Sequence, residues 1–495
     1  MSKGKINCDY QIKQLRKRLV KIMINNEVSK ICRTMKMSNY NIIVKDRDDN
    51  LVIYNFLAGL PSLTKVMKSE ADAFSKVFFN DPIIKGSNCE KYIEITKKLL
   101  EVGILVDSNI DESVLFEAKT FEEIYDNRLF LTILPTGKCN FNCSYCLEAE
   151  QPLSRERMTV SAQEAVIKFV QKNIHNYSGL HVVWFGGEPL LEISTIKQLS
   201  EKLIKICKAR CIPYTAQTTT NGFCLDGATF NAMYKHKVYN YMITVDGFKE
   251  QHDKCRYMHN GAGTYDTIMK NLIEIRDNKQ YRFAHITIRV NITREVLDVM
   301  DEFILYLDST FSNDPRFSFL FMPVVNYSKT KPTDETFVSK QEVSERLRNN
   351  SVYMDKFMQK NTSVGLITPT DKCLASLKNS YVFAPDLRVY KCNAHYDRDD
   401  NCIGYIDLDG NMRIDNALHG KWYLMDEILH KIDNTCDKCF YRPACYINGK
   451  NCPYQYLKNV KERNTCPLKI NGFSERLEKE VLDAAEKFSC FVVSM

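Results

Sequence analysis

Two periods of apolar residues alternate along the chain from residue 128 to residue 328. Short runs rich in β-branched and aromatic residues predict buried strands, and longer segments with apolar residues every three or four positions predict amphipathic helices. We expect strands at 129–134, 181–185, 214–219, 239–245, 285–291 and 317–324. We expect helices at 161–174, 196–208, 226–236, 265–277 and 295–308, the first of which begins with a capping box from Ser161 to Glu164. Six such units predict a parallel sheet whose ligands bind at the carboxyl ends of the strands.

Shorter elements and a cysteine-rich region flank this core. Before it, strands expected at 40–44, 51–56 and 104–106 and helices expected at 71–79 and 90–102 predict a small α+β module. After it, an amphipathic helix is expected at 474–488. The sequence therefore predicts six segments: a basic arm at 1–37, the α+β module at 38–127, the core at 128–328, a helical bridge at 329–365, a cysteine-rich domain at 366–470 and a C-terminal helix segment at 471–495.

Composition and charge narrow the class of protein. The 495 residues are 44% hydrophobic and 26% charged, as expected of a folded globular protein. The net charge of +7 comes from residues 1–37, which hold ten Lys and Arg against two Asp and Glu. This arm is a helix that binds an acidic partner, a solvated helix, or an extension upstream of a start at Met35 or Met37. Neither a signal peptide nor a run long enough for a membrane span is present, so we expect a cytoplasmic protein without membrane contact.

Three cysteines follow the first expected strand of the core in the spacing C-x3-C-x2-C, namely Cys139, Cys143 and Cys146. Thiolates are soft ligands that suit iron-sulfur clusters and zinc. A structural zinc site needs a fourth protein ligand close by, and neither His nor Cys occurs between Cys146 and residue 168. The three cysteines therefore favour a cluster that leaves one iron open for chemistry, over both a zinc site and three buried thiols without a metal.

This spacing resembles that of the radical SAM family, C-x3-C-x-aromatic-C, with Tyr145 as the aromatic residue. The resemblance implies an α/β fold, a partial (β/α)6 TIM-type barrel preceded by a small winged-helix-like module. It also implies a 4Fe-4S cluster whose open iron binds S-adenosyl-L-methionine (SAM) and cleaves it reductively to a 5'-deoxyadenosyl radical. In peptide-modifying members the N-terminal module binds a leader peptide as an added edge strand. A structural cap on the barrel is the other interpretation of residues 38–127.

Further candidate residues gather where the next four strands end. Gly186 and Gly187 permit close backbone approach, and Glu188 offers a carboxylate to an ammonium group; they resemble the family's motif for the methionyl amine of SAM, the alternative being an ordinary turn. Asp246 is the expected proton acceptor, because a carboxylate at the carboxyl end of a barrel strand suits that role. By the resemblance the remaining residues contact SAM, together with Tyr145: Thr219, Asn221, His252, Arg256, Arg289 and Asn291. The competing interpretations are turn formation for the Thr and Asn after the third strand, solvation for the His and Arg after the fourth, and an interior ion pair for Arg289.

A second group of cysteines occupies the cysteine-rich region: Cys373, Cys392, Cys402, Cys436, Cys439, Cys445, Cys452 and Cys466. This density indicates metal binding, and zinc ribbons are one interpretation. The order resembles the SPASM domain, which implies two auxiliary 4Fe-4S clusters, one held by Cys436, Cys439, Cys445 and Cys466 and the other by Cys373, Cys392 and Cys452.

Three departures from the SPASM pattern matter. Leu387 replaces a glycine, the gap from Cys445 to Cys452 is longer than usual, and the Cys373 cluster lacks an assigned fourth ligand. Cys402 is one candidate for that ligand. We favour an open iron that binds a substrate thiolate, because a coordinated thiol is deprotonated.

These patterns predict a radical SAM oxidoreductase that matures a ribosomally made (RiPP) precursor peptide. Our hypothesis for the bond is a thioether cross-link, as in sactipeptide and ranthipeptide synthases. The expected partners are the leader-bearing peptide and a low-potential electron donor such as flavodoxin or ferredoxin. An alternative within the family is an anaerobic sulfatase-maturating enzyme, which forms formylglycine. An alternative of another class is a non-catalytic zinc- or nucleic-acid-binding protein, although nucleic acid is not expected because the basic arm lies outside the cysteine-rich region.

Overall fold

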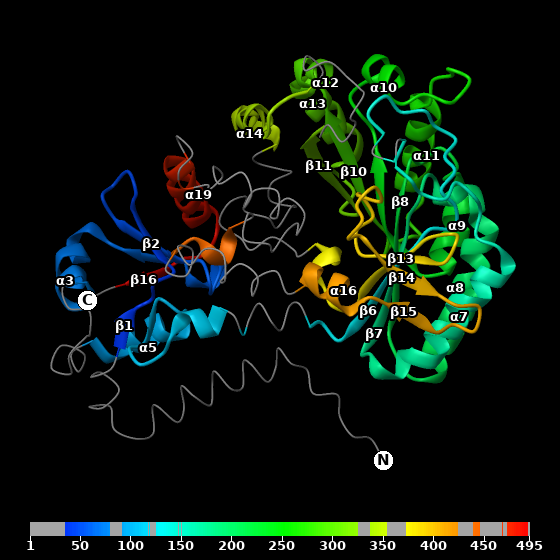
Figure 1. Cartoon of the computed structure of the whole chain (residues 1–495). Helices are drawn as coiled ribbons and strands as arrows, with labels where there is room; N and C mark the ends of the chain where they lie inside the picture. Colours follow the sequence, from blue (N-terminus) through cyan, green and yellow to red (C-terminus); the bar gives the residue numbers. More distant parts are fainter. Residues whose placement is uncertain are drawn as a thin grey trace. The chain divides into compact units, whose positions relative to one another are not determined.

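The computed structural model describes eleven stretches of the chain, residues 35–79, 92–116, 118, 125–146, 148–149, 151–324, 337–353, 373–423, 439–445, 468 and 473–493. They belong to two compact units, which are considered separately (Figure 1). The first unit comprises residues 1–123, 363–373 and 425–495, and the second comprises residues 124–362 and 374–424. This division cuts the predicted cysteine-rich domain twice, after residue 373 and after residue 424.

The second unit is built on a ten-stranded sheet with the order β11-β10-β9-β8-β7-β6-β12-β13-β14-β15. Its first six strands are parallel neighbours in chain order. They are β6 (Arg128–Ile133), β7 (Gly179–Trp184), β8 (Tyr214–Thr220), β9 (Val238–Thr244), β10 (His285–Ile292) and β11 (Phe317–Pro323). All six predicted core strands are therefore confirmed to within about two residues, and their carboxyl ends meet at one edge of the sheet.

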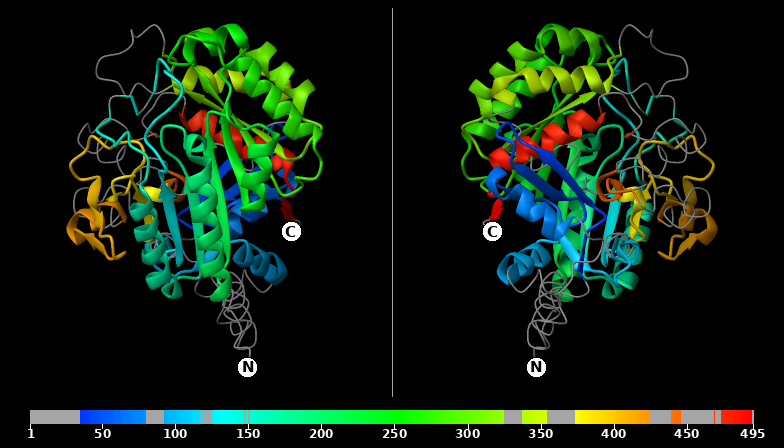
Figure 2. Two further views of the ribbon diagram at one scale, coloured as in Figure 1. Left: turned by 90° about the vertical axis from the view of Figure 1, so that its right-hand side faces the viewer. Right: turned by 90° about the vertical axis from the view of Figure 1, so that its left-hand side faces the viewer.

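Helices connect these strands, and the left-hand view of Figure 2 shows several of them in front of the sheet. They are α7 (Val160–Asn173), η3 (Ile174–Asn176), η4 (Pro189–Glu192), α8 (Ile193–Ala209), α9 (Gly227–Lys235), α10 (Lys249–Cys255), α11 (Tyr265–Asp277), α12 (Arg294–Asp298) and α13 (Met300–Phe311). The helix predicted at 295–308 is two helices, separated at Val299. Among the described residues, no helix has the length and the apolar character that crossing a membrane requires.

The predicted capping box at Ser161 is wrong. The N-cap of α7 is Thr159, which has extended backbone angles, and its side chain accepts a hydrogen bond from the Ala162 backbone N–H. Helix α7 begins at Val160, so Ser161 lies inside its first turn. Both hydroxyl residues suit a cap by composition, and the extended conformation of Thr159 decides between them.

The cysteine-rich region extends the same sheet. Strand β12 (Ser380–Phe383) pairs parallel with β6, and the antiparallel strands β13 (Arg388–Tyr390), β14 (Cys402–Ile406) and β15 (Met412–Ile414) follow it. Helix α16 (Asn416–Tyr423), the short η7 (Leu374–Ser376) and helix α14 (Lys340–Asn349) complete this unit. Helix α14 falls within the predicted bridge, of which residues 329–336 and 354–365 lie outside the described part.

The first unit contains a four-stranded sheet with the order β16-β4-β3-β2. Its strands are β2 (Asn41–Lys45), β3 (Leu51–Asn55), β4 (Thr64–Val66) and β16 (Phe491–Val493); β16 pairs parallel with β4, and the other pairs are antiparallel. A second sheet pairs β1 (Met35–Met37) with β5 (Leu105–Asp107). The remaining elements are η1 (Leu60–Ser62), α3 (Lys68–Phe78), α5 (Ile93–Glu101), η8 (Arg442–Ala444) and α19 (Phe473–Lys487).

The end of the chain completes the N-terminal sheet. Helix α19 buries Leu477, Val481 and Ala484 in a core shared with Val52 and Tyr54 of β3, and β16 then adds a strand beside β4. The amphipathic helix predicted at 474–488 is thus present, and it packs on strands more than 400 residues earlier in the sequence.

Candidate active site

The cysteine loop connects β6 to α7. Cys139 and Cys143 are partly buried in it and Cys146 is exposed. Burial raises the pKa of the Cys139 thiol to about 12, with smaller contributions from the charges of Glu188, Cys143 and Cys146. Within the described residues no three His, Cys, Asp or Glu side chains surround a point where one metal ion fits. Three thiols around one loop are instead the donor set of an iron-sulfur cluster, which is larger than a single ion.

Gly186 and Gly187 pack directly against this loop. A Cβ on Gly187 would lie 2.4 Å from the Lys138 carbonyl oxygen, and one on Gly186 would lie 2.3 Å from the Thr136 carbonyl oxygen. Gly186 also has φ 122°, which favours glycine. The next residue, Glu188, donates its backbone N–H to Lys138 O at 2.8 Å. These glycines therefore allow close approach to the backbone that carries Cys139, and their predicted approach to a ligand stays a prediction.

The Glu188 carboxylate is fully buried at the end of β7. Its Oε1 accepts hydrogen bonds from Leu190 N at 3.0 Å and Thr220 Oγ1 at 2.7 Å, and its Oε2 accepts one from Asn221 N at 2.7 Å. Burial raises the pKa of Glu188, while these hydrogen bonds and the charge of Arg256 oppose the rise. A carboxylate has about four acceptor positions, so one position on Oε2 is left open among the described residues.

Strand β8 links this carboxylate to the cysteine loop. Thr220 bonds Glu188, and Asn221 donates its side-chain amide to Asn140 Oδ1 at 2.8 Å, beside Cys139. Sequence patterns point to Thr219 and Asn221 but do not single out Thr220 and Asn140. The alternation of β8 carries the missing signal, because buried Ala216 places Thr218 and Thr220 on its own face of the strand.

Tyr145 is the centre of a second polar cluster. Its hydroxyl donates to Asp246 Oδ2 and accepts from Arg256 Nη1 at 3.1 Å and from Asn291 Nδ2 at 3.2 Å. A phenol has one donor and two acceptor positions, so all of them are used. Asp246 is fully buried at the end of β9, and its Oδ1 accepts from Asn291 N at 2.7 Å. Burial raises the pKa of Asp246, and the Arg256 charge opposes that rise. The cluster ties the cysteine loop to β9 and β10.

His252 is hydrogen-bonded to the backbone of Asp246, a member of this cluster. The ring is fully buried in α10, and its Nδ1 accepts from Asp246 N at 3.1 Å. The other nitrogen, Nε2, therefore carries the proton and faces Thr264 Oγ1 at 3.1 Å, and that hydroxyl donates to Arg256 O at 2.7 Å. Burial lowers the pKa of His252 well below its ordinary value. Both ring nitrogens thus have protein partners, and Thr264 is a further residue that sequence patterns do not single out.

Arg289 and Asn291 lie on one face of β10, as their spacing predicts, and Arg289 Nε donates to Asn291 Oδ1 at 2.7 Å. Arg256 is buried, its guanidinium lies 5.7 Å from the Phe141 ring centroid, and its Nε has no acceptor among the described residues. The Arg256 charge lowers the pKa of Cys143 against the effect of burial. A donor without a partner, an open position on Glu188 and three thiols fit an anionic cluster with a bound ligand that carries an ammonium group.

Five cysteines of the second group lie in the described part of the chain. Cys373, Cys439 and Cys445 belong to the first unit, and Cys392 and Cys402 to the second. Cys436, Cys452 and Cys466 lie outside the described residues, so both auxiliary ligand sets stay predictions. Around Cys392 the backbone is held by Asn401, whose Oδ1 accepts from Cys392 N at 2.7 Å and whose Nδ2 donates to Cys392 O at 2.8 Å.

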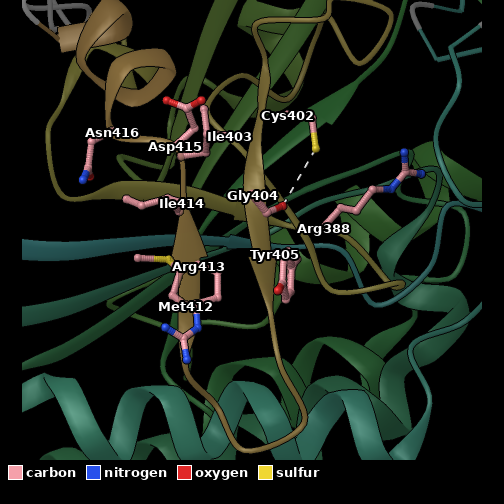
Figure 3. Close-up of a pocket in the computed structure, with 10 residues that line it drawn as sticks. All are labelled: Arg388, Cys402, Ile403, Gly404, Tyr405, Met412, Arg413, Ile414, Asp415 and Asn416. Carbon is pink, nitrogen blue, oxygen red and sulfur yellow. Dashed lines mark hydrogen bonds between the residues drawn. The ribbon is translucent and has the colours of Figure 1, made fainter.

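Cys402 begins β14 beside an open groove whose lining includes Arg388, Tyr405 and Arg413 (Figure 3). Its thiol donates to Gly404 O at 3.8 Å. Gly404 has φ 156°, and a Cβ there would lie 1.9 Å from Arg413 O, so glycine is what allows β14 and β15 to pair. The groove contains none of the residues around Glu188 or Asp246.

Leu387, which stands where the SPASM pattern has glycine, keeps the backbone conformation that glycine favours. Its φ is 65°, in the left-handed region, at the turn between β12 and β13. Leu387 N donates to Ala384 O at 3.0 Å, and its side chain is buried. Burial of the leucine offsets the strain of this conformation, which costs roughly 1–2 kcal/mol.

Comparison with known proteins defines the class to which this arrangement belongs. Residues 133–304 match the Radical SAM superfamily. The chain matches this superfamily over these residues, as the cysteine spacing predicts. It is a radical SAM enzyme related to the anaerobic sulfatase-maturating enzymes.

Individual relatives define this relationship further. The cysteine-type anaerobic sulfatase-maturating enzyme of Clostridium novyi (strain NT) is 25% identical over 328 residues, which cover 63% of this chain and 84% of that enzyme. The radical SAM cyclopropyl synthase TigE of Paramaledivibacter caminithermalis is 24% identical over 164 residues, which cover 30% of this chain and 33% of TigE. The solved structure of anSMEcpe with bound AdoMet and Cp18Cys peptide has the same fold, with a TM-score of 0.52 and 18% identity over 73% of this chain and 100% of that one.

Proposed function

We propose that this radical SAM enzyme oxidises a ribosomally made peptide and closes a cross-link in it, with a thioether as the specific bond. One observation carries the proposal: the cysteine loop, Glu188 and the Tyr145 cluster converge at the carboxyl ends of β6 to β10. Tyr145 joins the loop to β9 and β10, and Glu188 N joins the end of β7 to Lys138 of the loop. Convergence of this kind is the arrangement for a ligand held at that edge of the sheet.

The residues around the cysteine loop take defined roles in this proposal. Cys139, Cys143 and Cys146 would hold a 4Fe-4S cluster, which with bound SAM supplies an electron and a hydrogen-abstracting 5'-deoxyadenosyl radical. The open acceptor position on Glu188 would bind the methionyl ammonium group of SAM. Asn221 and Thr220 orient Glu188 and the loop, and Arg256 supplies positive charge beside the loop and both buried carboxylates.

Asp246 takes a different role from the one that its position alone indicates. Each of its oxygens already accepts a hydrogen bond, from Asn291 N and from the Tyr145 hydroxyl. His252 holds the backbone of the same residue. We assign Asp246, His252 and Asn291 to positioning of Tyr145.

The substrate class rests on three supports. The anSMEcpe structure contains a bound Cp18Cys peptide, and the relative TigE is a radical SAM cyclopropyl synthase. The third support is the sheet of the first unit, in which β2 is an outermost strand among the described residues and could pair with a peptide. The cysteines of the second group extend the proposal to two auxiliary 4Fe-4S clusters of a SPASM domain, which would accept the surplus electron. The partners would be the precursor peptide and a low-potential electron donor.

The test is an anaerobic reaction with SAM, a strong reductant and a cysteine-containing peptide encoded next to the gene. Closing a thioether removes one hydrogen from carbon and one from sulfur, so the product must be lighter by two hydrogens and keep its sulfur. Protein prepared without oxygen should hold about twelve irons, four for each of three clusters. Colourless protein that holds zinc alone would refute the radical proposal and restore the zinc-binding alternative.

A second candidate function is formylglycine formation, which the relationship to the Clostridium novyi enzyme favours. Oxidation of a peptide cysteine to the aldehyde releases its sulfur, whereas the cross-link retains it. A product without sulfur that reacts with hydrazine would therefore select the second candidate. The same reaction distinguishes the two functions without knowledge of the physiological reductant.

A further inference from the structure

The segment after the cysteine loop runs back beside its first residues. Thr136 and Arg157 form an antiparallel bridge, Gly137 N donates to Glu156 O at 3.3 Å, and Met158 N donates to Pro135 O at 2.8 Å. The contact is close, since a Cβ on Gly137 would lie 2.1 Å from Ser154 O. The three cysteines therefore lie in a loop whose two ends are brought together by residues 154–158.

Arg155 reaches from this segment into the loop. Its Nη1 donates to Gly137 O at 3.0 Å, and its Nη2 donates to Ala149 O at 3.2 Å and to Glu148 O. Gly137 lies two residues before Cys139, and Glu148 lies two residues after Cys146. One guanidinium thus bridges the backbone on both sides of the cysteine triad, a geometry that its planar fork of donors suits and that the single ammonium of Lys cannot reproduce.

Other residues hold the middle of the loop. Asn142 N donates to Tyr257 O at 2.8 Å, and Ser144 N donates to Cys255 O at 2.9 Å. These bonds fix the stretch between Cys139 and Cys146, but they leave the two ends to be joined. The Arg155 side chain joins those ends directly, in addition to the backbone pairing of residues 135–137 with 156–158.

We propose that Arg155 is a positioning residue that holds the cysteine loop closed, so that Cys139, Cys143 and Cys146 face one cluster. The link to a cluster rests on the proposed function, whereas the closure of the loop does not. The Arg157 side chain, two residues away, forms an ion pair with Glu192 at 3.2 Å and is largely exposed. It is a matched control from the same segment.

Amide hydrogen exchange of the metal-free protein tests the closure by itself. Exchange in residues 138–153 should accelerate about tenfold in Arg155→Met and in Arg155→Lys, because both lose the bridging hydrogen bonds. Arg157→Met should stay within about twofold of the native chain. Equal exchange in the Arg155 and Arg157 variants, at unchanged melting temperature, would overturn the proposal.

Iron loss tests the consequence for the cluster. In anaerobically prepared protein, the EPR signal that changes on addition of SAM identifies the cluster of the cysteine loop. Its decay in the presence of a ferrous chelator should be about tenfold faster in both Arg155 variants than in Arg157→Met. A native protein without such a signal would refute the proposed function alone, and accelerated exchange without accelerated decay would refute the role of the closed loop in holding the cluster.

Discussion

Glu188 and Asp246 are both fully buried carboxylates at the carboxyl ends of parallel strands, yet their surroundings differ. Glu188 accepts from two backbone N–H groups and one hydroxyl and keeps an acceptor position open among the described residues. Asp246 bonds the Tyr145 hydroxyl, whose remaining positions are filled by Arg256 and Asn291. In our proposal the first carboxylate receives a cationic group and the second holds the cysteine loop, because only the second bonds a side chain of that loop.

The difference shows that burial and a raised pKa do not by themselves identify a catalytic carboxylate. Burial raises the pKa of both groups, and Arg256 opposes the rise in both. What separates them is where the donors come from, since the donors to Glu188 lie in its own turn and at the end of β8, whereas one donor to Asp246 is Tyr145 of the cysteine loop. Each prediction below changes a residue near either Glu188 or Asp246.

Gly187→Ala, next to Glu188, is expected to have the largest effect. The new Cβ would meet the Lys138 and Gly137 carbonyl groups at 2.4 and 2.7 Å, so the cysteine loop must move. We expect a loss of about 3 kcal/mol of unfolding free energy or more, measured by chemical denaturation, together with loss of iron from the SAM-binding cluster. Gly261→Ala is the control, because its φ is 83° but nothing lies within 4 Å of the added Cβ. Gly187 itself is not in the left-handed region, so equal losses in both variants would mean that the collision with the loop costs no more than the strain at Gly261, and would contradict this prediction.

Glu188→Gln tests the open acceptor position. A carboxamide keeps one acceptor oxygen and presents an NH2 group to a donor, so the ammonium group of SAM loses its charged partner. We expect SAM to bind about tenfold more weakly, or more, because a hydrogen bond to a charged group contributes roughly 1.5–3 kcal/mol. Equilibrium binding of SAM to the anaerobic protein measures this. Asp246→Asn should change the affinity much less, and an equal loss in both variants would remove the distinction between the two carboxylates.

Tyr145→Phe tests the hydrogen bonds around Asp246. Removing the hydroxyl leaves Asp246, Arg256 and Asn291 each without one buried partner, so we expect a loss of about 1–3 kcal/mol of unfolding free energy. A double-mutant cycle sharpens the comparison. Tyr145→Phe with Asp246→Asn should cost less than the sum of the single changes, since the two residues share a hydrogen bond, while Tyr145→Phe with Glu188→Gln should be close to additive. Additivity in both cycles would contradict the assignment of Tyr145 to the Asp246 cluster.

Sequence patterns were sufficient for the core of the second unit and for the edge of the sheet at which the candidate site residues gather. Strands β6 to β11 alternate or run apolar strongly enough to set their bounds, and their order places Glu188, Asn221, Asp246 and Asn291 at one edge. Local patterns could not decide between Thr159 and Ser161 as the cap of α7, because the answer depends on backbone angles. Nor could they distinguish Thr219 from Thr220 until the buried face of β8 was known.

Local sequence patterns could not predict contacts between distant parts of the chain. Strand β16 pairs with β4 across more than 400 residues, and its three residues carry too short a pattern to identify a partner. Leu387 shows the opposite case, since the sequence marks it as a departure from glycine while the structure keeps the left-handed turn. Sequence patterns could not identify Arg155 for another reason. Its side chain bonds backbone carbonyl oxygens, which every residue type provides.

The smallest expected effect is on the pH dependence of stability, and it comes from a residue next to Asp246. His252 lies behind Asp246, and burial, with a further contribution from the Arg256 charge, holds its pKa well below the ordinary value. The unfolded chain binds a proton on this group below about pH 6.5 and the folded chain does not, so stability falls as the pH falls. His252→Asn removes this dependence, and the stability difference between the native protein and the variant should shrink by about 1–2 kcal/mol from pH 7 to pH 5. Glu188 and Asp246, whose raised pKa values act in the opposite direction, are present in both proteins and cancel in the difference. A difference that stays constant over this range would mean that His252 takes up its proton in the folded state, and that the hydrogen bond from Asp246 N does not fix its neutral form.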